Sequence, residues 1–385
     1  MLLEMAKHQE IRIMLVGGGT AGHIHPLFAV YSAVMSRQAH TRFTYIGEPG
    51  VYATKFIELK IPIKKIFSGK LHQDSPFQIP LDIFKLIVSF FQSLWHIFWE
   101  MPDMLFSKGG PGSIAPVIVA RFFMIPVCIH ESDSVPSITT KITAKFAKKI
   151  FLAFKETRDK LRGQDKKKCQ IVGNPLRPFL LENFPDKRTA KISLGFHPDK
   201  PLLVIMGGSQ GSRRINNLIT VSLKQILELG IQVFHQTGTN LFGEVSGVLG
   251  HYFDSLEEMD IAGYHITDFF DQNILKEVFA AADVIVSRSG SSIFEFAALG
   301  KPSILIPFPE AAQNHQLQNA LIYEQTGACI LLEEHEITVR RFIDFLEPLI
   351  TELDLLEQMS NSAKSFAKPD AAYKIAEELL KLIHR

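Results

Sequence analysis

A glycine-rich turn followed by a histidine is the first segment of the chain that could carry chemistry. Residues 17–22 read Gly-Gly-Gly-Thr-Ala-Gly, follow a buried apolar run, and are followed at once by His23. Such a turn between a strand and a helix directs backbone N–H groups at an anion. A neutral imidazole on the first helical turn could reach a group held there and act as a general base. A histidine that caps the loop by hydrogen bonding explains the same pattern.

A second candidate anion site lies at residues 284–319. Val284–Val286 is a β-branched run, a serine-rich turn follows it, and a short expected helix carries Glu295. We predict that Ser291 or Ser292 caps this helix, that the turn binds a phosphate, and that Glu295 accepts hydrogen bonds from a ribose diol. A polar cluster follows the next strand, at Gln313, Asn314, His315, Gln316 and Gln318. An ordinary βαβ unit with a solvated loop is the alternative.

A third glycine turn, Gly207-Gly208-Ser209-Gln210-Gly211, also follows a buried strand directly. The first turn alone fits G-x-G-x-x-G, and Glu48 after the next strand could bind a ribose, so an NAD-dependent oxidoreductase is a serious alternative. A glycine turn in each half fits better with one nucleotide site per half, or with one ligand held between the halves.

His130 and Glu131 are placed at the carboxyl end of another expected strand. Open α/β sheets bind their ligands at that end of the strands, which favours a functional role. A structural ion pair or hydrogen bond explains the two residues equally well.

Composition limits the classes of protein that the chain can represent. It has 385 residues, 46% hydrophobic and 21% charged, with a net charge of +1. This length favours two domains, and the balanced charge argues against nucleic acid as a partner. The three cysteines have no metal-ligand spacing, and we read them as reduced thiols of a cytosolic protein. We expect no signal peptide and no transmembrane span.

Strands and helices alternate in both halves, which predicts two parallel, doubly wound sheets. We place a hinge near Asn174–Pro185. Two helices are expected to be long, one over Ser137–Lys149 and one over Thr338–Met359. A break at Lys368-Pro369-Asp370 would let the last helix, Ala371–Ile383, cross back to the first domain.

The segment Pro80–Glu100 predicts a helix with a narrow polar stripe and an unusually wide apolar arc. Both tryptophans of the chain lie in it, and lysines precede it at positions 60, 64, 65 and 70. A helix buried against the first sheet is the simpler interpretation. An apolar surface rimmed by lysines also suits an anionic membrane. The residues predicted to contact it are Phe84, Phe91, Trp95 and Trp99.

Six segments occur in the order and spacing of one known family: GGGTAGHIHPLFAV, GGPGSIAPVIVA, HESDSVPSITTKITAKFA, VGNPLRP, GGSQGS and SRSG…E…GKPSILIPFP…NHQLQNA. Over nearly its whole length the chain resembles the MurG family, which are peptidoglycan glycosyltransferases of family 28. The resemblance implies the α/β GT-B fold, two Rossmann-like doubly wound domains facing across a cleft. It implies an acceptor domain at 1–176, completed by 369–385, and a UDP-sugar domain at 177–368.

The resemblance also implies roles for single residues. Two are expected to be catalytic, His23 as the base and Glu131. Arg177 and Ser209 are expected near the donor diphosphate, and Phe270 near the uracil. The full set of expected substrate-binding residues is Thr20, Ala21, Gly22, Asp133, Arg177, Ser209, Gln210, Phe270, Ser291, Ser292, Glu295, His315 and Gln316. Two positions depart from the family pattern: Asp133 stands where a family member has asparagine, and Thr140 stands where asparagine is common.

The reaction implied by the resemblance is an inverting transfer of N-acetylglucosamine from UDP-N-acetylglucosamine to lipid I, the undecaprenyl-pyrophosphoryl-MurNAc-pentapeptide, which gives lipid II for the cell wall. The implied location is peripheral, on the cytoplasmic side of the inner membrane. We expect no cofactor, and no metal because the sequence lacks Asp-x-Asp. The alternatives are another GT-B glycosyltransferase of lipid acceptors, a UDP-sugar epimerase, and a membrane scaffold without catalytic activity.

Overall fold

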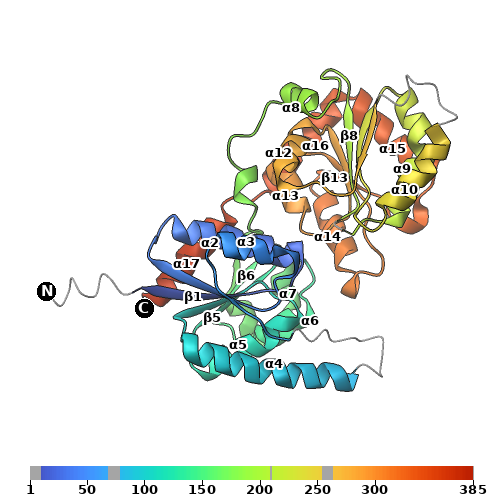
Figure 1. The fold of residues 1–385 in the computed structure, drawn as a ribbon. Coiled ribbons are helices and arrows are strands. Elements are labelled where there is room, and N and C mark those ends of the chain that lie inside the picture. Colours follow the sequence, from blue (N-terminus) through green and yellow to red (C-terminus); the bar gives the residue numbers. More distant parts are fainter. Residues whose placement is uncertain (1–9, 68–78, 209, 254–262, 385) are drawn as a thin grey trace. The chain divides into compact units, whose positions relative to one another are not determined.

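The chain divides into two compact units, each built around one parallel sheet (Figure 1). The structure is a computed structural model that describes residues 10–67, 79–208, 210–253 and 263–384. The first unit comprises Met1–Pro178 and Lys368–Arg385, and the second comprises Phe179–Ala367.

The sheet of the first unit has seven parallel strands in the order β3-β2-β1-β4-β5-β6-β7. The order reverses between β1 and β4, which makes this point of the carboxyl edge the place where open α/β sheets bind ligands. The strands are β1 (Ile11–Val16), β2 (Thr41–Ile46), β3 (Ile63–Lys64), β4 (Met104–Ser107), β5 (Val127–Glu131), β6 (Lys149–Leu152) and β7 (Cys169–Ile171).

The central strands β1 and β4 are largely apolar because helices cover both faces of the sheet. On one face, Ile13 and Leu15 of β1 pack with α2 (Ala21–Met35) and α17 (Ala371–Ile383). On the other face, Met14 and Val16 pack with α4 (Ile79–Glu100) and α5 (Ile114–Phe122). Figure 1 shows these two helices on the opposite side of the sheet from α2. The remaining α-helices of this unit are α3 (Ala53–Glu58), α6 (Ile138–Thr143) and α7 (Glu156–Lys160).

The long helix predicted over Ser137–Lys149 is wrong. α6 ends at Thr143, and β6 begins at Lys149. Its residues Ile150 and Phe151 are buried in the sheet between β5 and β7. Residues 144–148 form the connection between α6 and β6, and Ala144 and Ala147 are buried there.

The sheet of the second unit has six parallel strands in the order β10-β9-β8-β11-β12-β13. The strands are β8 (Leu202–Met206), β9 (Gln232–Gln236), β10 (Tyr264–Thr267), β11 (Val284–Ser287), β12 (Ser303–Leu305) and β13 (Cys329–Leu331). The helices around it are α8 (Lys187–Ser193), α9 (Arg213–Glu228), α10 (Phe242–Phe253), α12 (Gln272–Ala281), α13 (Ile293–Ala298), α14 (His315–Glu324), α15 (Val339–Thr351) and α16 (Leu353–Phe366).

The second long helix, predicted over Thr338–Met359, is divided in two. Glu352, between α15 and α16, has φ −103° and ψ 88°, outside the helical region. The break lets both helices bury apolar residues in the same core, with Leu346 and Leu349 from α15 and Met359 from α16.

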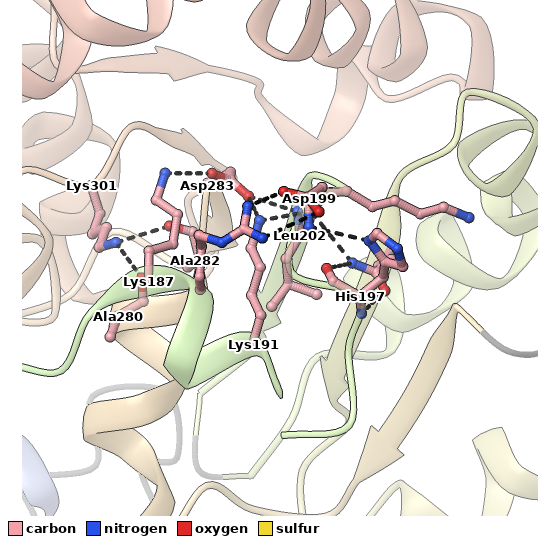
Figure 2. A network of polar contacts seen from close by, with 12 residues as sticks. Lys187, Lys191, His197, Asp199, Leu202, Ala280, Ala282, Asp283 and Lys301 are labelled. Atoms are coloured by element: carbon pink, nitrogen blue, oxygen red, sulfur yellow. Dashed lines mark hydrogen bonds and ion pairs between the residues drawn. The ribbon is translucent and has the colours of Figure 1, made fainter. Parts of the chain in front are cut away.

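A polar network at the amino end of the second sheet fixes α8 in place (Figure 2). The carboxylate of Asp283 accepts hydrogen bonds from Lys187 Nζ at 2.7 Å, Lys191 Nζ at 2.6 Å and the Leu202 N–H at 2.8 Å. Burial alone raises the pKa of Asp283, but the ion pairs with the two lysines lower it overall. Lys301 Nζ donates to the carbonyls of Ala280 and Ala282 in the same region.

Candidate functional site

Residues far apart in the first unit meet at the carboxyl ends of β1, β4 and β5. A Cβ placed on Gly110 would lie 3.1 Å from the backbone nitrogen of Gly18, and one placed on Gly18 would lie 2.9 Å from Nδ1 of His23. Gly110 also has φ +90°. Both turns must therefore be free of side chains for the imidazole to lie between them.

His23 is held as a neutral imidazole. Its Nδ1 lies 2.9 Å from Thr20 Oγ1, and its backbone N–H donates to the Thr20 carbonyl at the start of α2. Burial, with a smaller contribution from Lys108, lowers the pKa of His23 to about 3. A neutral ring keeps a nitrogen lone pair available for a proton, which general-base catalysis requires. Ala21 and Gly22 are half-buried beside it, and Thr20 is exposed.

Lys108 is a buried cation that the sequence interpretation missed. Only 3% of it is exposed, its backbone N–H donates to Val16, and its Nζ donates to Ser132 Oγ at 3.1 Å. Burial lowers its pKa, against the opposing effects of Glu131 and Asp133. A lysine between a buried strand and a glycine pair was the signal that could have revealed it.

Glu131 organises its own loop. Its carboxylate accepts hydrogen bonds from the Asp133 N–H at 3.1 Å, the Ser137 N–H at 3.0 Å and Thr140 Oγ1 at 2.6 Å. These bonds hold the turn that starts α6. Thr140, a departure from the family pattern, is thus one of the donors to this carboxylate.

His130 bonds to a different partner from its neighbour Glu131. Its Nε2 lies 2.9 Å from the Gly173 carbonyl, while its Nδ1 has no hydrogen-bond partner among the described residues. Burial, followed by the charge of Lys108, lowers its pKa well below the usual value. A neutral His130 forms no ion pair. Of the two structural roles considered from the sequence, an ion pair or a hydrogen bond, His130 therefore has the hydrogen bond.

Arg177 belongs to the first unit and lies near the start of α2. Its charge contributes, after burial, to lowering the pKa of His25 to about 4. Burial raises the pKa of Tyr52, and Arg177 acts in the opposite direction. The rings of His25 and Tyr52 are in edge-to-face contact at 5.1 Å. These contacts place a guanidinium group beside the helix that carries His23.

In the second unit, the glycine turn after β8 is fixed by Gln236, a buried residue that was not predicted. Gln236 Nε2 donates to the Gly208 carbonyl at 3.0 Å, and its Oε1 accepts from the Phe270 N–H at 3.3 Å. Phe270 is buried edge-on against Phe234. Gln210 is exposed, whereas Ser209 lies outside the described residues.

The serine turn after β11 is joined to the polar cluster that begins α14. Ser289 Oγ donates to the Gln316 carbonyl at 2.8 Å, and Asn319 Nδ2 donates to the Ser289 carbonyl. Gln316 Oε1 accepts from the Phe308 N–H at 3.0 Å, and His315 Nδ1 lies 2.7 Å from the Ala312 carbonyl. The two segments therefore form one surface.

The predicted side-chain cap of α13 is wrong. Ser292 occupies the cap position with helical backbone angles and makes no side-chain cap bond. Backbone bonds close the turn instead, from the N–H of Ile293 to Gly290 and from that of Phe294 to Ser291. Glu295 is half-buried in the first turn of this helix.

Arg288 links the loop after β12 to the residue that precedes α9. The sequence interpretation did not predict this arginine. It donates to Ser212 Oγ at 2.7 Å and to the carbonyls of Ile306 and Pro307 at 3.0 Å. It forms an ion pair with Glu334, which is 2% exposed and also pairs with Arg214. An arginine directly after a buried strand was the available signal.

The helix α4 buries Ile97 in the core and packs Phe90 and Leu94 against it, yet it also exposes many apolar side chains. Its serines Ser89 and Ser93 are buried, whereas Trp95 is 63% and Trp99 is 65% exposed. The other exposed apolar residues of this helix are Ile83, Phe84, Ile87, Phe91 and Phe98. We call these seven residues the α4 apolar face. No helix in the described parts of the chain is both long enough and apolar enough to cross a membrane.

Two Rossmann-like units, each with a glycine turn at the carboxyl edge of its sheet, define the class of GT-B proteins. Comparisons with known proteins agree with this class. Residues 13–152 match the model of the glycosyltransferase family 28 N-terminal domain, and residues 202–375 match that of the C-terminal domain. The chain belongs to glycosyltransferase family 28, which confirms the predicted family and replaces the NAD oxidoreductase alternative.

Relatives and solved structures match over almost the whole chain. A protein of Christiangramia forsetii named UDP-N-acetylglucosamine--N-acetylmuramyl-(pentapeptide) pyrophosphoryl-undecaprenol N-acetylglucosamine transferase is 31% identical over 97% of this chain and 98% of its own length. The crystal structure of Acinetobacter baumannii MurG has a TM-score of 0.74 at 22% identity, covering 96% and 99% of the two chains. The UDP-GlcNAc 2-epimerase of Neisseria meningitidis scores 0.70 at 15% identity, covering 96% and 100%. These structures confirm the predicted fold class.

Proposed function

We propose that this chain transfers N-acetylglucosamine from UDP-N-acetylglucosamine to a pyrophosphoryl-undecaprenol-linked N-acetylmuramyl-pentapeptide. The observation that carries the proposal is the similarity to transferases of that name along 97% of the chain, together with both domain models of family 28. The chemistry places the enzyme in peptidoglycan synthesis, and hence in cell-wall growth and division.

The first unit supplies the groups that activate the acceptor. Neutral His23 takes the proton from the acceptor hydroxyl, and the oxygen then attacks the anomeric carbon of the donor sugar from the face opposite UDP. Glu131 keeps the loop of Asp133 in place through its three hydrogen bonds. Thr20, Ala21 and Gly22 bind the acceptor at the same turn.

The second unit supplies most of the groups that hold the donor, and Arg177 of the first unit joins them. Glu295 accepts hydrogen bonds from the ribose, and Phe270 contacts the uracil through its backbone. His315 and Gln316 complete the surface beside the serine turn. The amides near Ser209 and Gln210, the hydroxyls of Ser291 and Ser292, and the guanidinium of Arg177 stabilise the charge that builds on the departing diphosphate.

The α4 apolar face attaches the enzyme to the cytoplasmic side of the inner membrane as a peripheral protein. Tryptophan and phenylalanine side chains suit the interface between lipid and water, and half-buried Lys64 and exposed Lys65 lie on the chain before α4. Replacing Trp95 and Trp99 by glutamate should abolish co-flotation with vesicles that contain anionic lipid. If this double variant floats with the vesicles as well as the unsubstituted protein does, the α4 apolar face does not attach the enzyme to the membrane.

The transfer itself is tested with radiolabelled UDP-N-acetylglucosamine and the lipid-linked acceptor, followed by extraction into butanol. Label in the butanol phase is expected. A UDP-sugar epimerase is the second candidate, favoured by the likeness to the Neisseria meningitidis epimerase. It predicts conversion of UDP-N-acetylglucosamine without any lipid, and no label in butanol.

A further inference from the structure

A pocket of about 390 Å³ opens in the first unit between the loop after β2 and the segment after β3. Its volume falls in the range of about 300–1,000 Å³ that is usual for small-molecule sites. It is lined by Glu48, Pro49, Gly50, Ala53, Lys65, Ile66, Phe67 and Gln92. None of these residues has a role in the donor or acceptor chemistry described above.

One side of this pocket abuts the turn that carries His23. A Cβ on Gly19 would lie 3.0 Å from the carbonyl oxygen of Glu48, and one on Gly50 would lie 3.0 Å from the carbonyl oxygen of Gly19. The Tyr45 hydroxyl strengthens the junction by donating to the carbonyls of Gly17 and Glu48. A ligand in the pocket is therefore in direct reach of the glycine turn.

Another side of the pocket reaches the α4 apolar face. Gln92 lines the pocket and accepts a hydrogen bond from the Phe67 N–H at 2.9 Å. At 100° per residue, Gln92 lies on the helix between exposed Trp95 and buried Ser93. The pocket thus joins the glycine turn to the flank of the surface that we assign to the membrane.

The chemistry of the pocket lining indicates which part of the acceptor the pocket suits. Pro49, Ala53, Ile66 and Phe67 offer apolar surface, exposed Lys65 offers one cation, and exposed Glu48 adds one carboxylate. A diphosphate alone needs several donors and no large apolar wall. A prenyl chain next to a diphosphate needs an apolar wall with a cation at its rim, which matches this set.

We propose that this pocket binds the first isoprenyl units of the lipid acceptor, next to its diphosphate, with Lys65 contacting the phosphate. The inference rests on the proposed function, because the acceptor of the curated relatives is a pyrophosphoryl-undecaprenol. It gives the enzyme a means to select prenyl-linked sugars over sugars on other lipids. It also fixes the sugar at a constant distance from the membrane surface.

The main test fills the pocket with Ala53→Phe and uses Val51→Phe as the matched control. Val51 is 87% exposed in the same loop and does not line the pocket. Ala53→Phe should raise the KM for a prenyl-linked acceptor about tenfold and leave the KM for one linked to a straight alkyl chain unchanged. Val51→Phe should change neither KM, and the KM for the donor should be constant throughout.

A second measurement does not depend on turnover. A ten-carbon prenyl diphosphate, titrated by calorimetry, should bind the unsubstituted protein and Val51→Phe, and should bind Ala53→Phe at least tenfold more weakly. Lys65→Gln, which leaves the pocket volume intact, should weaken this binding, whereas Lys60→Gln should not. If the prenyl diphosphate binds but no sugar is transferred, the proposed function fails and the pocket assignment stands.

Three results would overturn the pocket assignment. The first is equal binding of the prenyl diphosphate to the protein and to Ala53→Phe. The second is an equal rise in KM for the prenyl-linked and alkyl-linked acceptors. The third is that Ala53→Phe changes the preference between acceptors with and without the peptide. This result would show that the pocket binds the peptide stem.

Discussion

The two candidate half-sites are built on the same kind of sheet edge but by different physical means. In the first unit, buried ionisable groups meet, and burial lowers the pKa of His23, His130 and Lys108. In the second unit, hydrogen bonds through Gln236, Ser289 and Arg288 hold loops in place. The difference suggests that the first unit performs proton chemistry and that the second holds a nucleotide.

The largest expected effect comes from His23→Ala. Loss of the base should lower kcat by about 10²–10⁴, the usual contribution of general acid–base catalysis. UDP affinity, measured by calorimetry, should be unchanged because His23 is not among the residues proposed to bind the donor. Near-normal turnover would remove His23 from the role of base and would leave the first unit without a catalytic group.

Glu295→Ala should have the opposite profile. Loss of charged hydrogen bonds to the ribose, at about 1.5–3 kcal/mol, should weaken UDP binding about ten- to a hundredfold. At saturating donor, kcat should fall far less than in His23→Ala. The comparison between the units fails if Glu295→Ala binds UDP normally, or if His23→Ala weakens UDP binding as much as Glu295→Ala does.

Lys108→Met should have the smallest effect, visible chiefly in acid. The charge of Lys108 lowers the pKa of His23, so its removal raises that pKa. A raised pKa leaves less neutral imidazole at low pH, and the acidic limb of the kcat/KM profile should move to higher pH. Lys108→Arg, which keeps the charge, is the control. If the acidic limb of the kcat/KM profile does not move in Lys108→Met, then Lys108 does not influence the pKa of His23.

The sequence predicted the alternation of strands and glycine turns because these signals are local. Apolar runs such as Ile11–Val16 and Leu202–Met206 lie in the sheets as expected. The boundary errors have tertiary causes. Lys149–Leu152 is a strand because neighbouring strands pair with it, and Glu352 breaks a helix so that both halves reach one core.

The residues of the candidate site likewise fall into those that local sequence signals predicted and those that the sequence did not reveal. His23 and Glu295 were predicted because they follow recognisable turns, and Glu131 because it ends an expected strand. Lys108, Gln236 and Arg288 were missed because their importance comes from burial against segments that are distant in sequence. For α4, the sequence indicated an apolar arc too wide for one sheet. It did not indicate that Ser89 and Ser93 of the polar stripe would be buried together with Ile97.

The orientation of α4 has a consequence for the kinetics of the reaction. An enzyme that lies on the bilayer shares a plane with its lipid acceptor, so the two meet by diffusion in two dimensions. The relevant acceptor concentration is then its mole fraction among the lipids, rather than its amount per volume of solution. Diluting the acceptor with inert phospholipid at a fixed bulk concentration should therefore slow the reaction, although every molecule in the tube is still present.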